Sequence, residues 1–134
     1  METKKETIKP EVGMSVTYYI GSDAYHKVIV DITRNGRNVL VMSADEVLGG
    51  VSVSDWNAIP MSVRAQRARG AWIELMTNLH DNAGDDFISA NHEVECIRNR
   101  NTFTLRNDGD YMKKGQNCGY LKLNSTYAYL DPSF

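Results

Sequence analysis

The sequence predicts an α+β fold that is mainly antiparallel β, a sandwich or a partly open barrel, with one inserted helix. Two observations carry this prediction. Asn-Gly and Asp-Gly turns at 35–36 and 108–109 interrupt strand-like runs, and such turns close β-hairpins because Gly, Asn and Asp readily adopt positive φ. One stretch of apolar residues with helical spacing separates the two strand-like segments.

The first strand-rich segment spans residues 12–48. Apolar residues alternate with small or polar ones from Val12 to Tyr18 and again over 28–33, which is the period of half-buried strands. Gly21 breaks the first pair, and the turn at 35–36 leads into a returning strand over 38–42. We therefore predict a three-stranded meander, with the arginines beside the 35–36 turn in solvent.

A helical insertion is predicted over about residues 56–84, with a helix from about Ser62, as its N-cap, to His80. Its apolar residues recur at steps of three and four: Ala65, Ala68, Trp72, Leu75, Met76 and Leu79. This stripe could pack on the chain's own sheet or on the helix of a partner. A helix inserted between two β-segments is a common place for a subunit contact, so we expect a homo-oligomer.

The second strand-rich segment is predicted over 92–130. Its expected elements are strand residues Val94 and Cys96, a turn at 99–101, strands at 102–105 and 111–112, a loop over 113–119, and a final strand pair that contains Leu121, Leu123, Tyr127 and Tyr129. The whole chain, 1–134, is expected to be a single domain.

Composition limits the classes of function. The 134 residues are 42% hydrophobic and 24% charged, with a net charge of −2, so no global field favours duplex nucleic acid. Residues 1–9 lack an apolar core and no apolar run approaches a membrane span. We expect no membrane partner and a cytoplasmic location. Cys96 and Cys118 are expected to be reduced thiols, with one disulfide as the alternative.

Metal and catalytic chemistry are not indicated. His80, His92 and Cys96 give three zinc ligands at best, and Asp81, Asp85 and Asp86 lack the order of a calcium loop. Those aspartates would instead form an acidic loop at a helix C-terminus, which the helix dipole disfavours. The common nucleophile and phosphate-loop motifs are missing. We therefore expect no enzyme and no cofactor, with a small hydrolase as a less favoured alternative.

The candidate ligand-binding residues are Arg98, Arg100, Phe103, Arg106, Asn107 and Tyr111. Guanidinium groups bind phosphate through paired N–H donors, and aromatic faces stack on bases. The arginines bracket the predicted strand 102–105 and would hold phosphates. Phe103 or Tyr111 would stack on a base, and Asn107 with Asp108 would bond the ribose or the base edge. The alternative is that most of these arginines are solvated surface charges and that Phe103 belongs to the core.

Several short motifs, taken in order, resemble a set of small, mostly uncharacterised phage-encoded proteins. They are Val-Gly-Met at 12–14, Gly-Ser-Asp-Ala at 21–24, Val-Ile-Val-Asp-Ile-Thr-Arg-Asn-Gly at 28–36, Phe-Thr-Leu-Arg-Asn at 103–107 and Tyr-Leu-Asp-Pro-Ser-Phe at 129–134. The segment from about 49 to 92 looks like an insertion relative to those proteins. In size, β-rich build and phage origin the chain is also similar to Thoeris anti-defence 1 proteins.

The resemblance to Thoeris anti-defence 1 implies a function. Members of that family sequester cyclic ADP-ribose-type signals, and some bind cyclic oligonucleotides, without cleaving them. The expected function is a phage anti-defence binding protein in the host cytoplasm that captures a host immune cyclic nucleotide. The alternative is a protein-directed inhibitor that binds a host defence enzyme or nuclease through the helix and the acidic loop, and a virion or DNA-packaging component also remains open.

Overall fold

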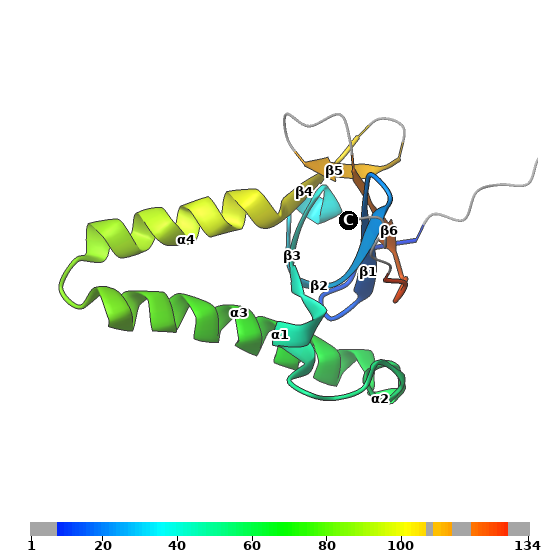
Figure 1. Cartoon of the computed structure of the whole chain (residues 1–134), viewed down its shortest axis with the longest axis horizontal. Helices are drawn as coiled ribbons and strands as arrows, with labels where there is room; N and C mark the ends of the chain where they lie inside the picture. The colour runs from blue at the N-terminus through cyan, green and yellow to red at the C-terminus, as the bar shows by residue number, and fades with distance from the viewer. Residues whose placement is uncertain (1–7, 107–108, 114–118, 129–134) are drawn as a thin grey trace, which may run out of the picture.

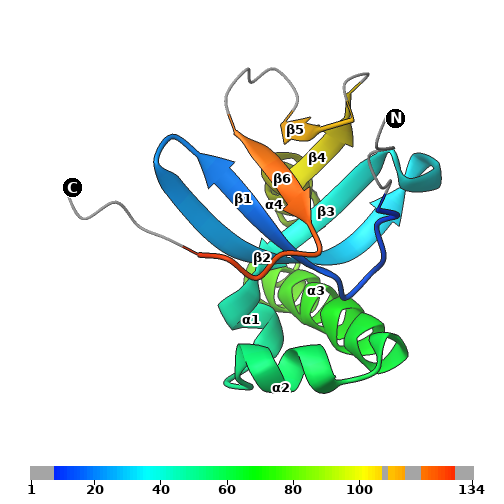
Figure 2. The same ribbon diagram turned by 90° about the vertical axis from the view of Figure 1, so that its right-hand side faces the viewer.

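The computed structural model describes residues 8–106, 109–113 and 119–128. Within these residues the predicted α+β class is confirmed: antiparallel strands follow one another around a closed barrel (Figure 1, Figure 2). The strands are β1 (Ser15–Ile20), β2 (Asp23–Thr33), β3 (Asn38–Ser43), β4 (Thr102–Leu105), β5 (Tyr111–Lys113) and β6 (Tyr120–Leu123). Pairing of β6 with β1, with Tyr19 opposite Tyr120, closes the barrel.

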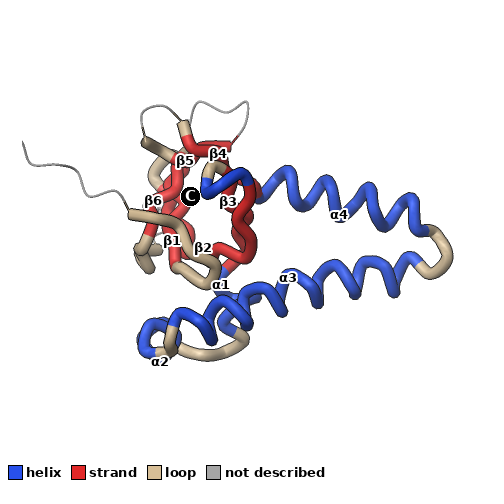
Figure 3. The backbone as a smooth tube through the Cα atoms, turned by 180° about the vertical axis from the view of Figure 1, so that it is seen from behind, coloured by secondary structure: helices blue, strands red, loops and turns tan. Residues whose placement is uncertain are grey.

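The helices lie between β3 and β4 in the sequence. They are α1 (Ala44–Leu48), α2 (Val53–Ala58), α3 (Met61–Ala83) and α4 (Phe87–Asn101), and a short 3-10 turn, η1 (Arg34–Gly36), joins β2 to β3. The predicted helix is confirmed as α3, although Pro60 rather than Ser62 takes the N-cap position. α3 and α4 form an antiparallel hairpin whose far end projects away from the barrel (Figure 1, Figure 3).

The prediction of strand residues at 94–96 and a turn at 99–101 is wrong, because α4 covers both. Ala90, Val94 and Ile97 recur at steps of four and three, which is a helical period, and Val94 and Ile97 pack in the apolar cluster that contains Trp72. Val94 and Cys96 are two residues apart, which also fits a strand. These two positions alone therefore do not distinguish a strand from a helix. The helical insertion therefore runs over 44–101 rather than 56–84, and strands resume at Thr102.

The acidic loop between α3 and α4 provides the N-cap residue of α4. Asp86 is the N-cap residue, and its carboxylate accepts a hydrogen bond of 3.0 Å from the amide of Ser89. This bond lowers the pKa of Asp86, and a negative charge is favourable at a helix N-terminus. The sequence predicts that these aspartates lie unfavourably at the C-terminus of α3. For Asp86 this prediction is wrong, because Asp86 caps the N-terminus of α4.

Two apolar clusters lie on opposite faces of β2 and β3. Ile29, Val39 and Val41 point into the barrel with the other members of the inner cluster, which are Met14, Val16, Tyr18, Phe103, Tyr111 and Leu121. Their neighbours Val28, Val30, Leu40 and Met42 point outward to a cluster with Trp56, Ala68, Trp72 and Val94 from the helices. Strand alternation thus places one side of each strand in the barrel and the other against the helices.

Gly13 fixes the entry to β1 against α3. Its φ is +91°, and a Cβ built there would lie 2.7 Å from the backbone nitrogen of Ala65. Its amide donates a hydrogen bond of 2.8 Å to the carbonyl of Ile29. Only a residue without a side chain allows this approach between the barrel and α3.

Both turns that the sequence singles out join antiparallel strands. In the first, Arg34, Asn35 and Gly36 have φ of 53°, 57° and 90°, as the predicted turn requires. In the second, Asn107 and Asp108 lie outside the described residues. At its edges, the amide of Arg106 donates to the carbonyl of Asp110 at 2.8 Å, and β4 and β5 pair antiparallel.

The predicted final strand pair is replaced by one strand and a covering segment. β6 already pairs with β1 and β5, so both of its edges are occupied. After β6 the chain crosses β1, where the hydroxyl of Thr17 lies 2.7 Å from that of Ser125 and donates to the carbonyl of Tyr127 at 2.9 Å. Tyr127 is therefore not a strand residue, and Tyr129 lies outside the described residues.

Candidate functional site

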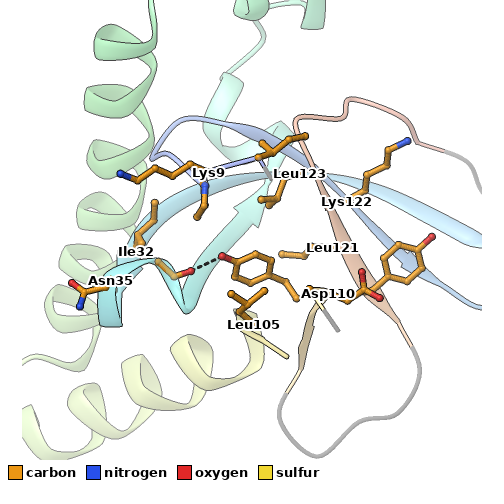
Figure 4. A pocket seen from close by; sticks show the side chains of 14 residues that line it. Lys9, Ile32, Asn35, Leu105, Asp110, Leu121, Lys122 and Leu123 are labelled. Atoms are coloured by element: carbon orange, nitrogen blue, oxygen red, sulfur yellow. Dashed lines mark hydrogen bonds between the residues drawn. The ribbon is translucent and has the colours of Figure 1, made fainter. Parts of the chain in front are cut away.

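A pocket of about 920 Å³ opens beside β5 and β6 (Figure 4). It lies between these strands, the first turn and the segment that precedes β1. Its lining residues are Ile8, Lys9, Pro10, Ile32, Asn35, Gly36, Leu105, Gly109, Asp110, Tyr111, Tyr120, Leu121, Lys122 and Leu123. This volume falls in the range of pockets that bind small organic ligands, and so does the combination of apolar walls with few polar groups.

Tyr111 connects the pocket wall to the first turn. Its side chain is 5% exposed, and its hydroxyl donates a hydrogen bond to the carbonyl of Gly36 (Figure 4). Burial raises the pKa of Tyr111, so the hydroxyl stays protonated at neutral pH. Leu105 and Leu121 lie beside its ring (Figure 4), and together they give the pocket a preformed apolar wall.

Charged side chains stand at the margin of the pocket. Lys9 and Lys122 lie on opposite sides of it, and their ammonium groups extend outward (Figure 4). Asp110, directly before β5, adds one carboxylate. Long lysine side chains can turn toward an anion at low cost because their stems rotate freely. The site can therefore combine apolar contact with two movable positive charges.

Stacked tyrosines extend from the pocket over the outside of the barrel. The Tyr19 ring stacks on that of Tyr120, with centroids 5.2 Å apart and planes inclined by 22°, and on that of Tyr127 at 6.2 Å and 20°. Tyr120 is 42% exposed and Tyr127 is 53% exposed. Because Tyr120 also lines the pocket, an aromatic face continues from the pocket to this surface.

Two further cations, Lys27 and Lys113, lie outside the pocket lining. The Lys113 ammonium lies 5.3 Å from the Tyr18 ring centroid and 5.7 Å from that of Phe103, within the range of cation–π attraction. Lys27 is half-buried, and burial together with the positive charge of Lys113 lowers the pKa of Lys27. This pair concentrates positive charge at a partly desolvated position of the barrel.

The structure does not bring the predicted ligand-binding arginines to the pocket. Arg98 lies on α4 with its guanidinium 5.7 Å above the Trp72 ring, and Arg100 is exposed on the same helix. Arg106 follows β4 and is exposed. Arg98 and Arg100 therefore belong to helix α4, and not to the ends of two strands joined by the predicted turn at 99–101.

Of the other predicted residues that the structure describes, only Tyr111 lines the pocket. Phe103 is 1% exposed and packs edge-on against Tyr18 at 5.0 Å inside the barrel, so the core alternative describes it and it offers no open face to a base. Asn107 lies outside the described residues. Tyr111, the alternative to Phe103 for base stacking, lines the pocket but is itself buried.

Sequence reasoning missed three lining residues with useful chemistry: Lys9, Tyr120 and Lys122. A signal for two of them existed, since Tyr120 and Lys122 alternate with Leu121 and Leu123. That alternation marks the outward positions of a half-buried strand. Lys9 carried no such signal because it precedes β1 and its place depends on the tertiary fold.

Among the described residues considered for zinc binding, His92 and Cys96 lie together without a third ligand. His92 Nε2 lies 3.6 Å from Cys96 Sγ, one helical turn away on α4 rather than along a strand. In the described part of the chain, no three His, Cys, Asp or Glu side chains gather closely enough to hold a metal ion. None of the helices described here has both the length and the apolar character needed to cross a membrane.

Comparisons with known proteins add no relative. No family model matches the sequence, and no curated protein or solved structure matches the chain. The function is therefore inferred from the pocket, the tyrosine stack and the helical hairpin.

Proposed function

We propose that this protein is a binding protein that captures a cyclic-nucleotide ligand in the pocket beside β5 and β6 and holds it without cleavage. The observation that carries the proposal is the combination of the 920 Å³ pocket with tyrosine rings and lysines on its lining. A nucleotide needs a stacking surface for its base and cations for its phosphates. The exposed ring of Tyr120 offers the first, and Lys9 and Lys122 offer the second.

Sequestration fits the chemistry of the lining. Among the described residues, the pocket's side chains include Asp110 as the one carboxylate and include no histidine, cysteine or serine. Cleavage of a phosphodiester or glycosidic bond usually needs a positioned nucleophile with a partner base or acid. The phage anti-defence role and the host cytoplasm follow from the sequence resemblance and belong to the same proposal.

The test is to recover a bound nucleotide intact. Purified protein is mixed with cyclic ADP-ribose isomers and with cyclic oligonucleotides, freed of excess ligand, heated, and the supernatant is examined by chromatography. Release of unchanged nucleotide is the expected result. A nucleotide that returns as a hydrolysed product would indicate an enzyme, and failure to retain any of these nucleotides would rule the proposal out.

Matched variants locate the ligand. Tyr120→Ala and Lys122→Ala should each weaken binding about tenfold, because base stacking and a phosphate contact each contribute about 1–3 kcal/mol. Arg100→Ala removes a cation that is also exposed, on α4, and should leave affinity unchanged. Loss of binding in Arg100→Ala alone would instead place the ligand on the helix, as the sequence-based site predicts.

A protein-directed inhibitor is a second candidate, favoured by the tip of the helical hairpin. Phe87 is 64% exposed and Ile88 is 85% exposed beside Asp85 and Asp86, and exposed large apolar residues often mark protein contacts. If this is the function, Ile88→Asp abolishes inhibition of a host defence enzyme while nucleotide retention stays absent. Retention of a nucleotide with normal inhibition in Ile88→Asp would contradict it.

A further inference from the structure

Strand alternation places two lysines on the inner side of the barrel wall. Lys27 pairs with Val16 across β2 and β1, and Lys113 pairs with Phe103 across β5 and β4. Val16 and Phe103 both belong to the inner cluster, and directly paired residues of neighbouring strands point to the same side of a sheet. Two cationic side chains therefore start from a surface that is otherwise apolar.

Both lysines lie toward the end of the barrel that is away from the first turn. Tyr111 bonds to Gly36 in that turn, and Lys113 follows two residues farther along β5. On β2, Lys27 precedes the inner residue Ile29 by two positions, whereas the turn comes after β2. At about 3.3 Å per residue, each lysine is displaced about 7 Å from its inner neighbour toward this end, where an ammonium group can keep contact with water.

This end of the barrel also carries aromatic and hydroxyl groups. The Lys113 ammonium lies 5.3 Å from the centroid of the Tyr18 ring. Tyr25 pairs with Tyr18, and the two ring centroids are 6.4 Å apart; Tyr18 is 8% exposed and Tyr25 is 38% exposed. Ser43 pairs with Lys27 across β3 and β2, and its side chain makes no capping hydrogen bond to α1. An exposed ring and a hydroxyl therefore accompany the two cations.

The positive charges are incompletely compensated. Lys27 is half-buried, and burial together with the charge of Lys113 lowers the pKa of Lys27, although the charge of Glu46 on α1 opposes this effect in part. Asp23 accepts a hydrogen bond of 3.4 Å from the Tyr25 hydroxyl and lies four residues, about 13 Å, along β2 from Lys27. An anion held by both ammonium groups would relieve their mutual repulsion.

We propose that this end of the barrel binds a phosphate monoester, with the phosphate group between Lys27 and Lys113 and the ester group against the exposed ring of Tyr25. A phosphate monoester carries close to two negative charges at pH 7, which matches two ammonium groups, whereas a carboxylate or a phosphodiester carries one. The Ser43 hydroxyl supplies a further donor beside Lys27. This inference goes beyond the proposed function, because neither lysine lines the pocket.

Isothermal titration calorimetry with phenyl phosphate tests the site, at pH 7.5 in a buffer without phosphate. Benzoate is the matched probe, since it presents the same ring with a single negative charge. We expect phenyl phosphate to bind and benzoate to bind at least about tenfold more weakly. Absence of binding by phenyl phosphate, or equal binding of the two probes, would overturn the proposal.

Substitutions of the charged residues locate the phosphate group. Lys27→Gln and Lys113→Gln each remove one ammonium group and should weaken binding of phenyl phosphate about tenfold, while Lys113→Arg keeps the charge and should retain most of the affinity. Glu46→Gln removes the opposing carboxylate from an exposed position on α1 and should strengthen binding about threefold. Unchanged affinity in both lysine-to-glutamine variants would contradict the site.

Arg100→Gln is the control, because it removes an exposed cation from α4 and should leave phenyl phosphate binding unchanged. Circular dichroism confirms the fold of each variant. Lys122→Gln separates this site from the pocket: a loss of phenyl phosphate binding there, with normal binding in Lys113→Gln, would place the phosphate in the pocket and overturn the proposal. Retention of cyclic nucleotides is measured separately, so its failure would affect only the proposed function.

Discussion

The hydroxyl of Tyr111 on β5 donates a hydrogen bond of 2.5 Å to the carbonyl of Gly36 in η1, 75 residues earlier in the chain. It joins the strand that follows the second turn to the backbone of the first turn. Both residues line the same pocket. The two turns that mark the sequence therefore meet at the candidate site, through a tyrosine ring rather than through their arginines.

Replacing this tyrosine should cost both stability and binding. Tyr111→Phe keeps the ring but leaves the Gly36 carbonyl without its donor, so we expect the free energy of unfolding to fall by about 1–2 kcal/mol. Urea denaturation gives the value. Tyr120→Phe removes a hydroxyl from a tyrosine that is 42% exposed and should change stability little; an equal loss in both variants would argue against the bond.

Gly13→Ala should strongly destabilise the contact between β1 and α3. The new Cβ would meet the α3 backbone at 2.7 Å, and φ is +91°, so we expect a loss of about 3 kcal/mol or more. Gly50→Ala is the control, because Gly50 has φ of +93° and no atom lies within 4 Å of the position that a Cβ would take there. It should lose about 1 kcal/mol from backbone strain alone. Similar losses in both variants would remove the steric explanation.

Local signals predicted much of the fold. The alternation of β1 to β3 and the Asn35-Gly36 turn depend on neighbouring residues, and the period of α3 extends over twenty or so residues. The failure at 92–101 has a physical cause: Val94 and Cys96 satisfy a period of two, and the helical period appears only when Ala90, four residues before Val94, is included. The asparagines at 99 and 101 resemble a turn, yet Asn101 donates from its side chain to the Ile97 carbonyl at 2.8 Å within α4.

The candidate site was less predictable, because it is assembled by barrel closure. Lys9, Tyr111 and Lys122 come from three distant parts of the chain, and no spacing in the sequence brings them together. The arginines beside Phe103 indicated a pocket only if a turn at 99–101 joined two strands. With α4 in its place, Arg98 packs on Trp72 and Phe103 fills the barrel.

Removing the N-cap of α4 should lower the melting temperature. In Asp86→Ala the Ser89 amide loses its acceptor and the helix N-terminus loses a negative charge. The hydrogen bond lowers the pKa of Asp86, so this stabilisation is complete above the carboxyl's ordinary pKa and is lost as pH falls through the folded-state value. Thermal unfolding at pH 7 and pH 3 tests both statements. Asp85→Ala should have a smaller effect, and a reversed order would contradict the assignment.

His26 on β2 should make the protein less stable in mild acid. Its Nε2 is buried and has no hydrogen-bond partner among the described residues, and burial lowers the pKa of His26, partly opposed by the charge of Asp45. Between the folded-state pKa and the unfolded value near 6.5, the unfolded chain binds more protons than the folded chain. The free energy of unfolding therefore decreases as pH falls below about 6.5.

A comparison of variants separates the effect of His26 on stability from the effects of other groups that bind protons in mild acid. His26→Gln cannot gain the proton, so its loss of stability between pH 7.5 and pH 5.5 in urea denaturation should be smaller than that of the wild type. His92→Gln, at an exposed position on α4, should retain the wild-type slope. If His26→Gln follows the wild type across this range, the buried imidazole does not control the response, and protonation must act elsewhere in the fold.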